Sequence, residues 1–121
     1  MTSRRRYRMY QAETGISYRY GFAFDLRVVR PEGQGSGTDF VFMVTADQDV
    51  PFVMRVFLAD RALEAWSKAH GSGLSSSEQY AAAKLRLLQA FDQELSLRDK
   101  WLACVVDETN LDELLGPLQL V

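Results

Sequence analysis

The chain has 121 residues, of which 47% are hydrophobic, 12% aromatic and 25% charged, and its formal net charge at pH 7 is −2. This length is typical of one domain with its own core, and the aromatic content excludes a largely disordered chain. The single cysteine excludes an internal disulfide, and no apolar run reaches the length of a membrane span. A free thiol in an apolar run is typical of a reducing compartment, so we expect a cytoplasmic protein. We expect no signal peptide, because polar and aromatic residues follow the basic N-terminus.

Charge is distributed unevenly along the chain. Residues 1–30 contain seven arginines and two acidic residues, a net charge of +5, whereas residues 31–121 carry −7. The first ten residues interleave arginine with tyrosine: Arg4, Arg5, Arg6, Tyr7, Arg8 and Tyr10. Arginine can contact phosphates, and tyrosine can stack on bases. We expect residues 1–12 to be a flexible basic arm and residues 13–121 to be a single α+β domain.

The clearest pattern lies between Ile16 and Arg30, where every second residue is apolar. These residues are Ile16, Tyr18, Tyr20, Phe22, Phe24, Leu26 and Val28. A period of two predicts a strand with one buried face. The strand is longer than usual, and Gly21 indicates a bend or bulge within it.

A glycine-rich loop is expected over residues 31–37, followed by two further strands. The first carries Phe40, Phe42 and Val44 on one face, and the second covers residues 52–57. Short connections between three consecutive strands predict an antiparallel meander. The glycine loop lacks the lysine of a nucleotide-binding loop and precedes no helix, so we interpret it as a connection between strands.

The hydrophobic period changes from two to 3.6 after the third strand. Asp60 is the expected N-cap of a helix that runs to about His70 and ends at the glycine that follows. Ser75 and Glu78 have the spacing of a capping box, which predicts a second helix that ends near Leu95.

The remaining residues predict a short strand and a short helix. The apolar run over residues 101–106 indicates a buried strand, with a helix as the alternative, and residues 110–115 indicate a helix. The fold class is therefore α+β, with an N-terminal antiparallel β-meander of about three strands packed against two helices. The expected core residues are Phe22, Phe24, Phe42, Leu63, Trp66, Leu87 and Phe91.

No constellation in the sequence indicates catalysis or metal binding. His70 is expected in the last turn of a helix, and Cys104 has apolar neighbours that make a thiol unreactive. One histidine and one cysteine cannot supply a zinc site, and the acidic turns near Asp47 and Asp107 lack the pattern of a calcium loop. We expect no cofactor, no metal and no catalytic residue.

Three functional hypotheses follow. The first is a non-catalytic protein-interaction module, such as an adaptor, a chaperone-like protein or an inhibitor, that binds another protein and forms a homodimer through its long aromatic strand. The second is a nucleic-acid-associated regulator that uses the arginine arm. The third is a small-molecule binder or enzyme with a pocket lined by Tyr18, Tyr20, Trp66 and Tyr80. We expect no membrane partner. The expected partner-binding residues are Arg4, Arg5, Arg6, Tyr7, Arg8, Tyr10, Tyr18 and Tyr20.

Overall fold

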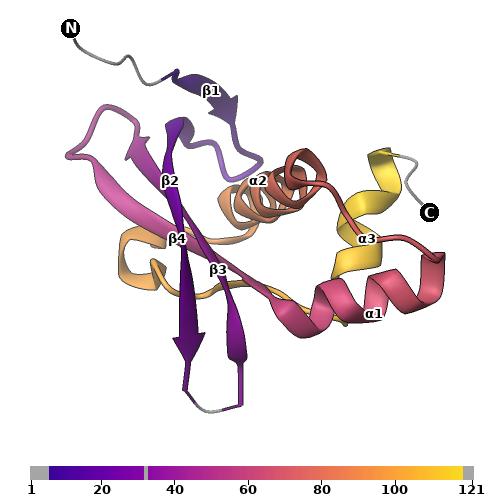
Figure 1. The fold of residues 1–121 in the computed structure, drawn as a ribbon. Coiled ribbons are helices and arrows are strands. Elements are labelled where there is room, and N and C mark those ends of the chain that lie inside the picture. The colour runs from indigo at the N-terminus through magenta and orange to yellow at the C-terminus, as the bar shows by residue number, and fades with distance from the viewer. Residues whose placement is uncertain (1–5, 32, 119–121) are drawn as a thin grey trace, which may run out of the picture.

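The described residues form a sheet of five strands whose spatial order follows their order in the chain (Figure 1). The computed structural model describes residues 6–31 and 33–118. The strands are β1 (Arg8–Gln11), β2 (Ser17–Arg30), β3 (Gly35–Ala46), β4 (Phe52–Ala59) and β5 (Cys104–Val106). The first four form an antiparallel meander, and β5 returns after the helices to pair in parallel with β4. The predicted α+β class is confirmed.

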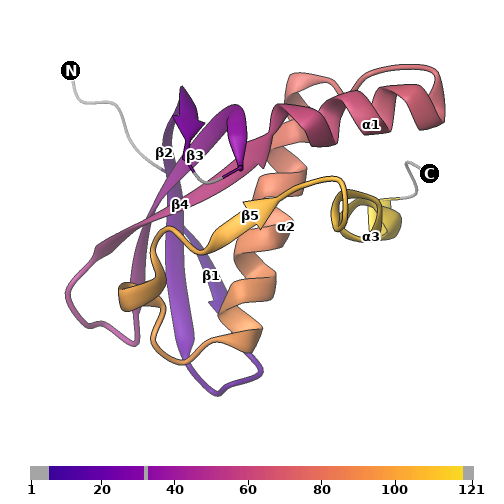
Figure 2. The ribbon, with the colours of Figure 1, turned by 90° about the horizontal axis from the view of Figure 1, so that it is seen from below.

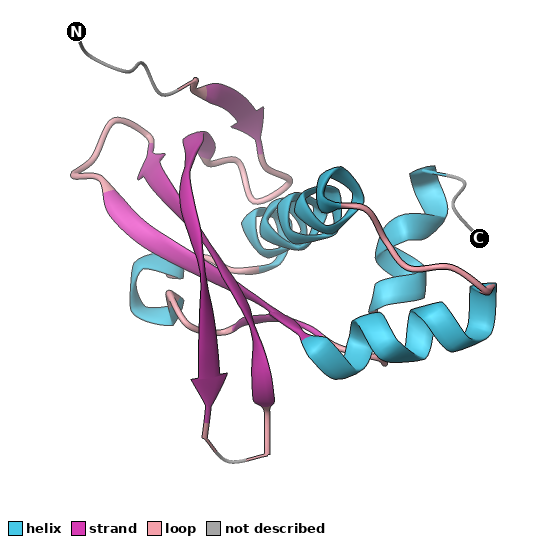
Figure 3. Ribbon diagram, in the orientation of Figure 1, coloured by secondary structure: helices cyan, strands magenta, loops and turns pink. Residues whose placement is uncertain are grey.

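Helices cover one face of this sheet (Figure 2, Figure 3). They are α1 (Asp60–His70), α2 (Ser76–Gln93) and α3 (Leu111–Leu115), with two short 3-10 helices, η1 (Leu97–Lys100) and η2 (Gly116–Leu118). The main core lies between the sheet and these helices. Phe42, Met54 and Val56 of the sheet are fully buried in it together with Leu87 and Phe91 of α2.

One expected core residue, Phe24, lies on the opposite face of the sheet and is 52% exposed. The register between β2 and β3 shifts between Phe22, which is opposite Phe42, and Phe24, which is opposite Val41. This bulge adds one residue to β2, so the alternation of its faces changes phase. The prediction for Phe24 was wrong because it continued the phase of Phe22 through the bulge. The other expected core residues are buried or half-buried: Phe22, Phe42, Leu63, Trp66, Leu87 and Phe91.

The predicted basic arm is interrupted by an ordered strand. Arg8–Gln11 form β1, which pairs with the start of β2, and Ala12 is only 4% exposed. This segment therefore contacts the core, because Tyr10 and Ala12 supply apolar contacts within a stretch that is otherwise rich in arginine. The boundary of the domain at residue 13 stays a prediction. Residues 1–5 of the predicted arm lie outside the described part of the chain.

The helix ends follow the predicted signals with one exception. The Ser75 N–H donates to Glu78 Oε1 at 2.8 Å and the Glu78 N–H donates to Ser75 Oγ at 3.2 Å, which confirms the capping box. Gly71 ends α1 with a φ of 79°. Asp60 is not the N-cap, because its carboxylate binds the Arg27 guanidinium and the preceding residue takes the capping position.

The C-terminal part contains the predicted short strand and short helix. β5 has three residues, whereas Trp101 and Leu102, at the start of the predicted strand, are 43% and 44% exposed. The Asn110 side chain donates to the Val105 carbonyl oxygen at 2.9 Å and does not cap α3. Among the described residues, no helix combines the length and apolar character needed to cross a membrane.

Candidate protein-binding surface

The predicted partner-binding residues occupy different environments. Arg4 and Arg5 lie outside the described residues. Arg6 and Arg8 are exposed. The Arg19 guanidinium carbon lies 4.6 Å from the ring centre of Tyr7. The role of these arginines in partner binding stays a prediction.

The tyrosines of β2 face the helices. The Tyr18 ring is 1% exposed and stacks on Phe91 of α2, with ring centres 4.0 Å apart and an angle of 7° between the planes. Tyr20 is 5% exposed and its ring centre lies 5.7 Å from that of Phe91. Both rings are core contacts, because α2 covers the face of β2 on which they lie. Neither ring is available to a partner at the surface of the chain.

Tyr10 joins β1 to α2 through a carboxylate. Its hydroxyl donates to Asp92 Oδ2 at 2.7 Å, and the Glu13 N–H donates to Asp92 Oδ1 at 2.9 Å. The hydrogen bond to Asp92, together with partial burial, raises the pKa of Tyr10 to about 12. Asp92 therefore holds the N-terminal strand and the turn after it against the domain.

This contact predicts a loss of stability at high pH. An unfolded tyrosine has a pKa of about 10, so between pH ~10 and ~12 the unfolded chain loses the phenol proton while folded Tyr10 retains it. The stabilisation is fully present below pH ~10 and disappears as the pH rises through the folded pKa. Tyr10→Phe should reduce the slope of the free energy of unfolding against pH in this window. Asp92→Asn should lower the pKa of Tyr10 in an NMR titration of labelled tyrosine, and an unchanged pKa would contradict the assignment.

Residues 21–30 of β2 form a sheet edge, called here the β2 edge, beside which no described strand lies on the side away from β3. On the side away from β3, β1 pairs only with the start of β2, from Ser17 opposite Gln11 to Tyr20 opposite Arg8. Beyond Tyr20, no described strand pairs with β2 on this side. Figure 1 shows this part of β2 in the hairpin with β3, and α1, α2 and α3 lie on the other side of β3. The β2 edge therefore offers backbone donors and acceptors to another chain.

The bulge places apolar and charged side chains of this edge on opposite faces. Asp25 is opposite Phe40 and Arg27 is opposite Thr38, so both lie on the helix-covered face. Phe24, Leu26 and Val28 lie on the other face, called here the open face. These edge residues were not among the predicted partner-binding residues, because the tyrosines at the beginning of the same strand were expected to form that surface.

The open face carries a second buried cluster around Asp39. This residue is 2% exposed and accepts hydrogen bonds from Arg30 Nη2 at 2.9 Å and Arg55 Nη1 at 3.4 Å. The Arg30 guanidinium carbon also lies 4.9 Å from the ring centre of Phe57, which is fully buried. Arg30 Nη1 donates to the Leu102 carbonyl oxygen at 3.0 Å, which ties the segment after η1 to this face.

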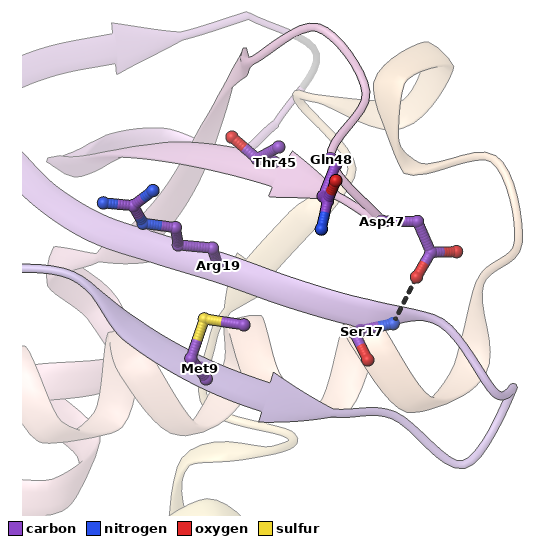
Figure 4. A pocket seen from close by; sticks show the side chains of 6 residues that line it. All are labelled: Met9, Ser17, Arg19, Thr45, Asp47 and Gln48. Atoms are coloured by element: carbon purple, nitrogen blue, oxygen red, sulfur yellow. Dashed lines mark hydrogen bonds between the residues drawn. The ribbon is translucent and has the colours of Figure 1, made fainter.

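A hollow of about 610 Å³ lies beside the start of β2 (Figure 4). Its lining residues are Met9, Ser17, Arg19, Thr45, Asp47 and Gln48. The Ser17 N–H donates to Asp47 Oδ1 at 2.9 Å, and the Ser17 hydroxyl donates to Gln11 Oε1 at 2.5 Å. An amide is not a general base, so these contacts do not activate the serine as a nucleophile. The hollow is a recess lined by both polar and apolar side chains.

The other reactive side chains have structural contacts. Cys104 is 2% exposed, and burial raises the pKa of its thiol, which keeps the thiol protonated and unreactive. The His70 ring contacts the Trp66 ring in a tilted arrangement, with ring centres 3.8 Å apart and an angle of 30° between the planes, and His70 Nε2 lies 3.6 Å from Asp112 Oδ1. Within residues 6–31 and 33–118, no three His, Cys, Asp or Glu residues form a group that could hold a metal ion.

Comparison of the chain with protein-family models, with curated proteins and with solved structures finds no match. The function is therefore inferred from the surface of the domain itself.

Proposed function

We propose that this chain is a non-catalytic protein-interaction module that pairs with another polypeptide along the β2 edge. The observation that supports this proposal is the absence of a described strand beside residues 21–30 on the side away from β3. An extended polypeptide added there gains backbone hydrogen bonds, and its alternate side chains contact one face of the sheet. Adaptors and inhibitors of this kind need no catalytic group.

The side chains of the β2 edge are suited to binding a partner polypeptide. Phe24 is 52% exposed at the start of this edge, and aromatic side chains are frequent anchors of protein interfaces. Many sheet edges are protected by lysines, prolines or bulges. In the β2 edge the bulge lies before Phe24, so it does not interrupt the residues that follow. The charged residues there, Asp25 and Arg27, have opposite signs. A partner strand that carries a positive charge opposite Asp25 and a negative charge opposite Arg27 can form an ion pair with each of them.

The two other hypotheses have less support. Tyr18, Tyr20, Trp66 and Tyr80 were expected to line a pocket between sheet and helices. The first three are packed in the core and are at most 5% exposed, and Tyr80 is half-buried against the same core. Nucleic-acid binding through Arg4 and Arg5 stays a prediction.

The test compares partners captured from the source cells by the wild-type chain and by two variants. Phe24→Lys changes the β2 edge, and Glu64→Lys places a lysine on the exposed part of α1 as the control. We expect the wild-type and Glu64→Lys chains to retain the same partner and Phe24→Lys to lose it. Hydrogen exchange of the purified complex should then show slower amide exchange in residues 21–30. A partner that protects another surface, or one retained equally by Phe24→Lys, would overturn the proposal.

A further inference from the structure

We infer that the polypeptide that pairs with the β2 edge is a second copy of this chain, aligned antiparallel about a two-fold axis at Leu26. This inference rests on the proposed function, because it names the partner of the same edge. It follows from the faces and charges of five consecutive residues of β2.

Symmetry restricts the possible registers. In an antiparallel pair, residues directly opposite each other lie on the same face of the sheet. After the bulge, Asp25 and Arg27 lie on the helix-covered face, whereas Phe24, Leu26 and Val28 lie on the open face. In one continuous sheet built from two copies, each residue must lie opposite a residue whose side chain is on the same face. Faces alternate along the strand, so the two-fold axis must pass beside a residue and its symmetry mate, and an axis halfway between two neighbouring residues is excluded.

The charges select one position for the axis. An axis at Asp25 places two carboxylates opposite each other, and an axis at Arg27 places two guanidinium groups opposite each other. Like charges in directly opposite positions destabilise a sheet. An axis at Leu26 places Asp25 opposite the partner's Arg27, and this contact occurs twice because of the symmetry. An axis at Val28 brings Asp25 and Arg27 opposite neither a like charge nor each other.

Both charged residues are available for this contact. Asp25 is exposed and forms no ion pair within the described part of the chain. The Arg27 side chain is 63% exposed, and its Nη1 and Nη2 atoms donate to Asp60 at 2.8 and 2.5 Å. The Arg27 Nε–H has no hydrogen-bond partner among the described residues, so the guanidinium can bind a second carboxylate.

The same register joins the apolar side chains of the open face. Phe24 lies opposite the partner's Val28, and Leu26 lies opposite the partner's Leu26 on the axis. Pairs of an aromatic and a β-branched side chain stabilise antiparallel strands. The exposed Phe24 ring is then partly covered, and the bulge before it stays outside the five paired positions. In this register the second copy supplies backbone hydrogen bonds to the edge, pairs Asp25 with Arg27, and covers part of the Phe24 ring.

Sedimentation equilibrium of charge variants tests the pairing. The wild-type chain and the control Glu64→Lys should form dimers at micromolar concentration. Asp25→Lys and Arg27→Glu should each weaken the homodimer by about tenfold or more, because each places like charges opposite each other at two positions. An equimolar mixture of the two variants should dimerise again, since the opposite charges then match. A monomeric wild-type chain, or Asp25→Lys with wild-type affinity, would overturn the inference.

Cysteine cross-linking tests the register independently of the Arg27 variant and its contact with Asp60. Leu26→Cys should give a disulfide-linked dimer on mild oxidation, whereas Val29→Cys, on the other face and away from the axis, should not. The native Cys104 is buried and does not interfere. Cross-linking of Val29→Cys but not of Leu26→Cys would overturn this register. A monomeric chain that still captures a different partner along residues 21–30 would overturn the homodimer alone and leave the proposed function standing.

Discussion

Truncation of Phe91 to alanine should lower the free energy of unfolding by about 3–5 kcal/mol. Phe91 is fully buried, and its ring contacts Tyr10 of β1 and both Tyr18 and Tyr20 of β2. The substitution removes an apolar side chain and leaves a cavity between α2 and the first two strands, which packing around a rigid sheet cannot fill completely. The loss of ring stacking on Tyr18 adds to this cost.

Urea denaturation followed by circular dichroism measures this effect. Leu95→Ala is the matched control, because Leu95 lies just after α2 and is 73% exposed. We expect this control to change the free energy of unfolding by no more than about 0.5 kcal/mol. A similar small change for Phe91→Ala would mean that α2 does not pack on the sheet in the orientation described.

Replacement of Asp39 by asparagine should destabilise the fold by about 3 kcal/mol, near the lower end of the range for breaking a buried ion pair. The change leaves the Arg30 guanidinium, whose side chain is 12% exposed, without its carboxylate. Arg55 loses the same partner, but its side chain is 32% exposed and water reduces the cost. Within the part of the chain that the structure describes, the Arg55 Nε atom is already buried without a hydrogen-bond partner, so loss of the carboxylate leaves this guanidinium less well satisfied.

A double variant separates the charge from the packing. Arg30→Met combined with Asp39→Asn should be more stable than Asp39→Asn alone, because no charge of Arg30 is then buried without a partner. Glu64→Gln, on the exposed part of α1, is the control for a simple loss of negative charge. Thermal and urea unfolding at low protein concentration measure all three variants. A double variant less stable than the single one would show that Arg30 is needed mainly for packing on Phe57.

Elements that depend on neighbouring residues were predicted well from the sequence. The alternation from Tyr18 to Phe22 places these side chains toward the core, and the Ser75–Glu78 capping box begins α2 as expected. Such signals are local, because they need only the strand period or a hydrogen bond within one turn of helix. The Asp60 prediction failed because the side chain that binds its carboxylate, Arg27, is 33 residues away.

The candidate surface was predicted less well. The sequence indicated an unusually long strand, and the structure places its part without a described neighbour on one side at residues 21–30. It did not indicate that α2 covers Tyr18 and Tyr20, or that Phe24 lies on the open face. A bulge leaves a weak local signal, since Gly21 lies near it but the register shift follows Phe22.

The sequence by itself determined the strands β2 to β5, the helices α1 to α3, their order and the antiparallel meander of β2 to β4, because strand and helix periods and turn residues act over a few positions. It did not indicate β1. Only the tertiary structure decided which edge of the sheet has no described strand beside it. β5 comes from the C-terminal part of the chain and pairs with β4, while β1 is too short to cover β2 beyond Tyr20. The physical reason is that strand pairing is decided by contacts between distant segments, and by a bulge that changes which face each following side chain occupies. The placement of Asp25, Leu26 and Arg27 beside each other on an accessible edge is a result of those distant contacts.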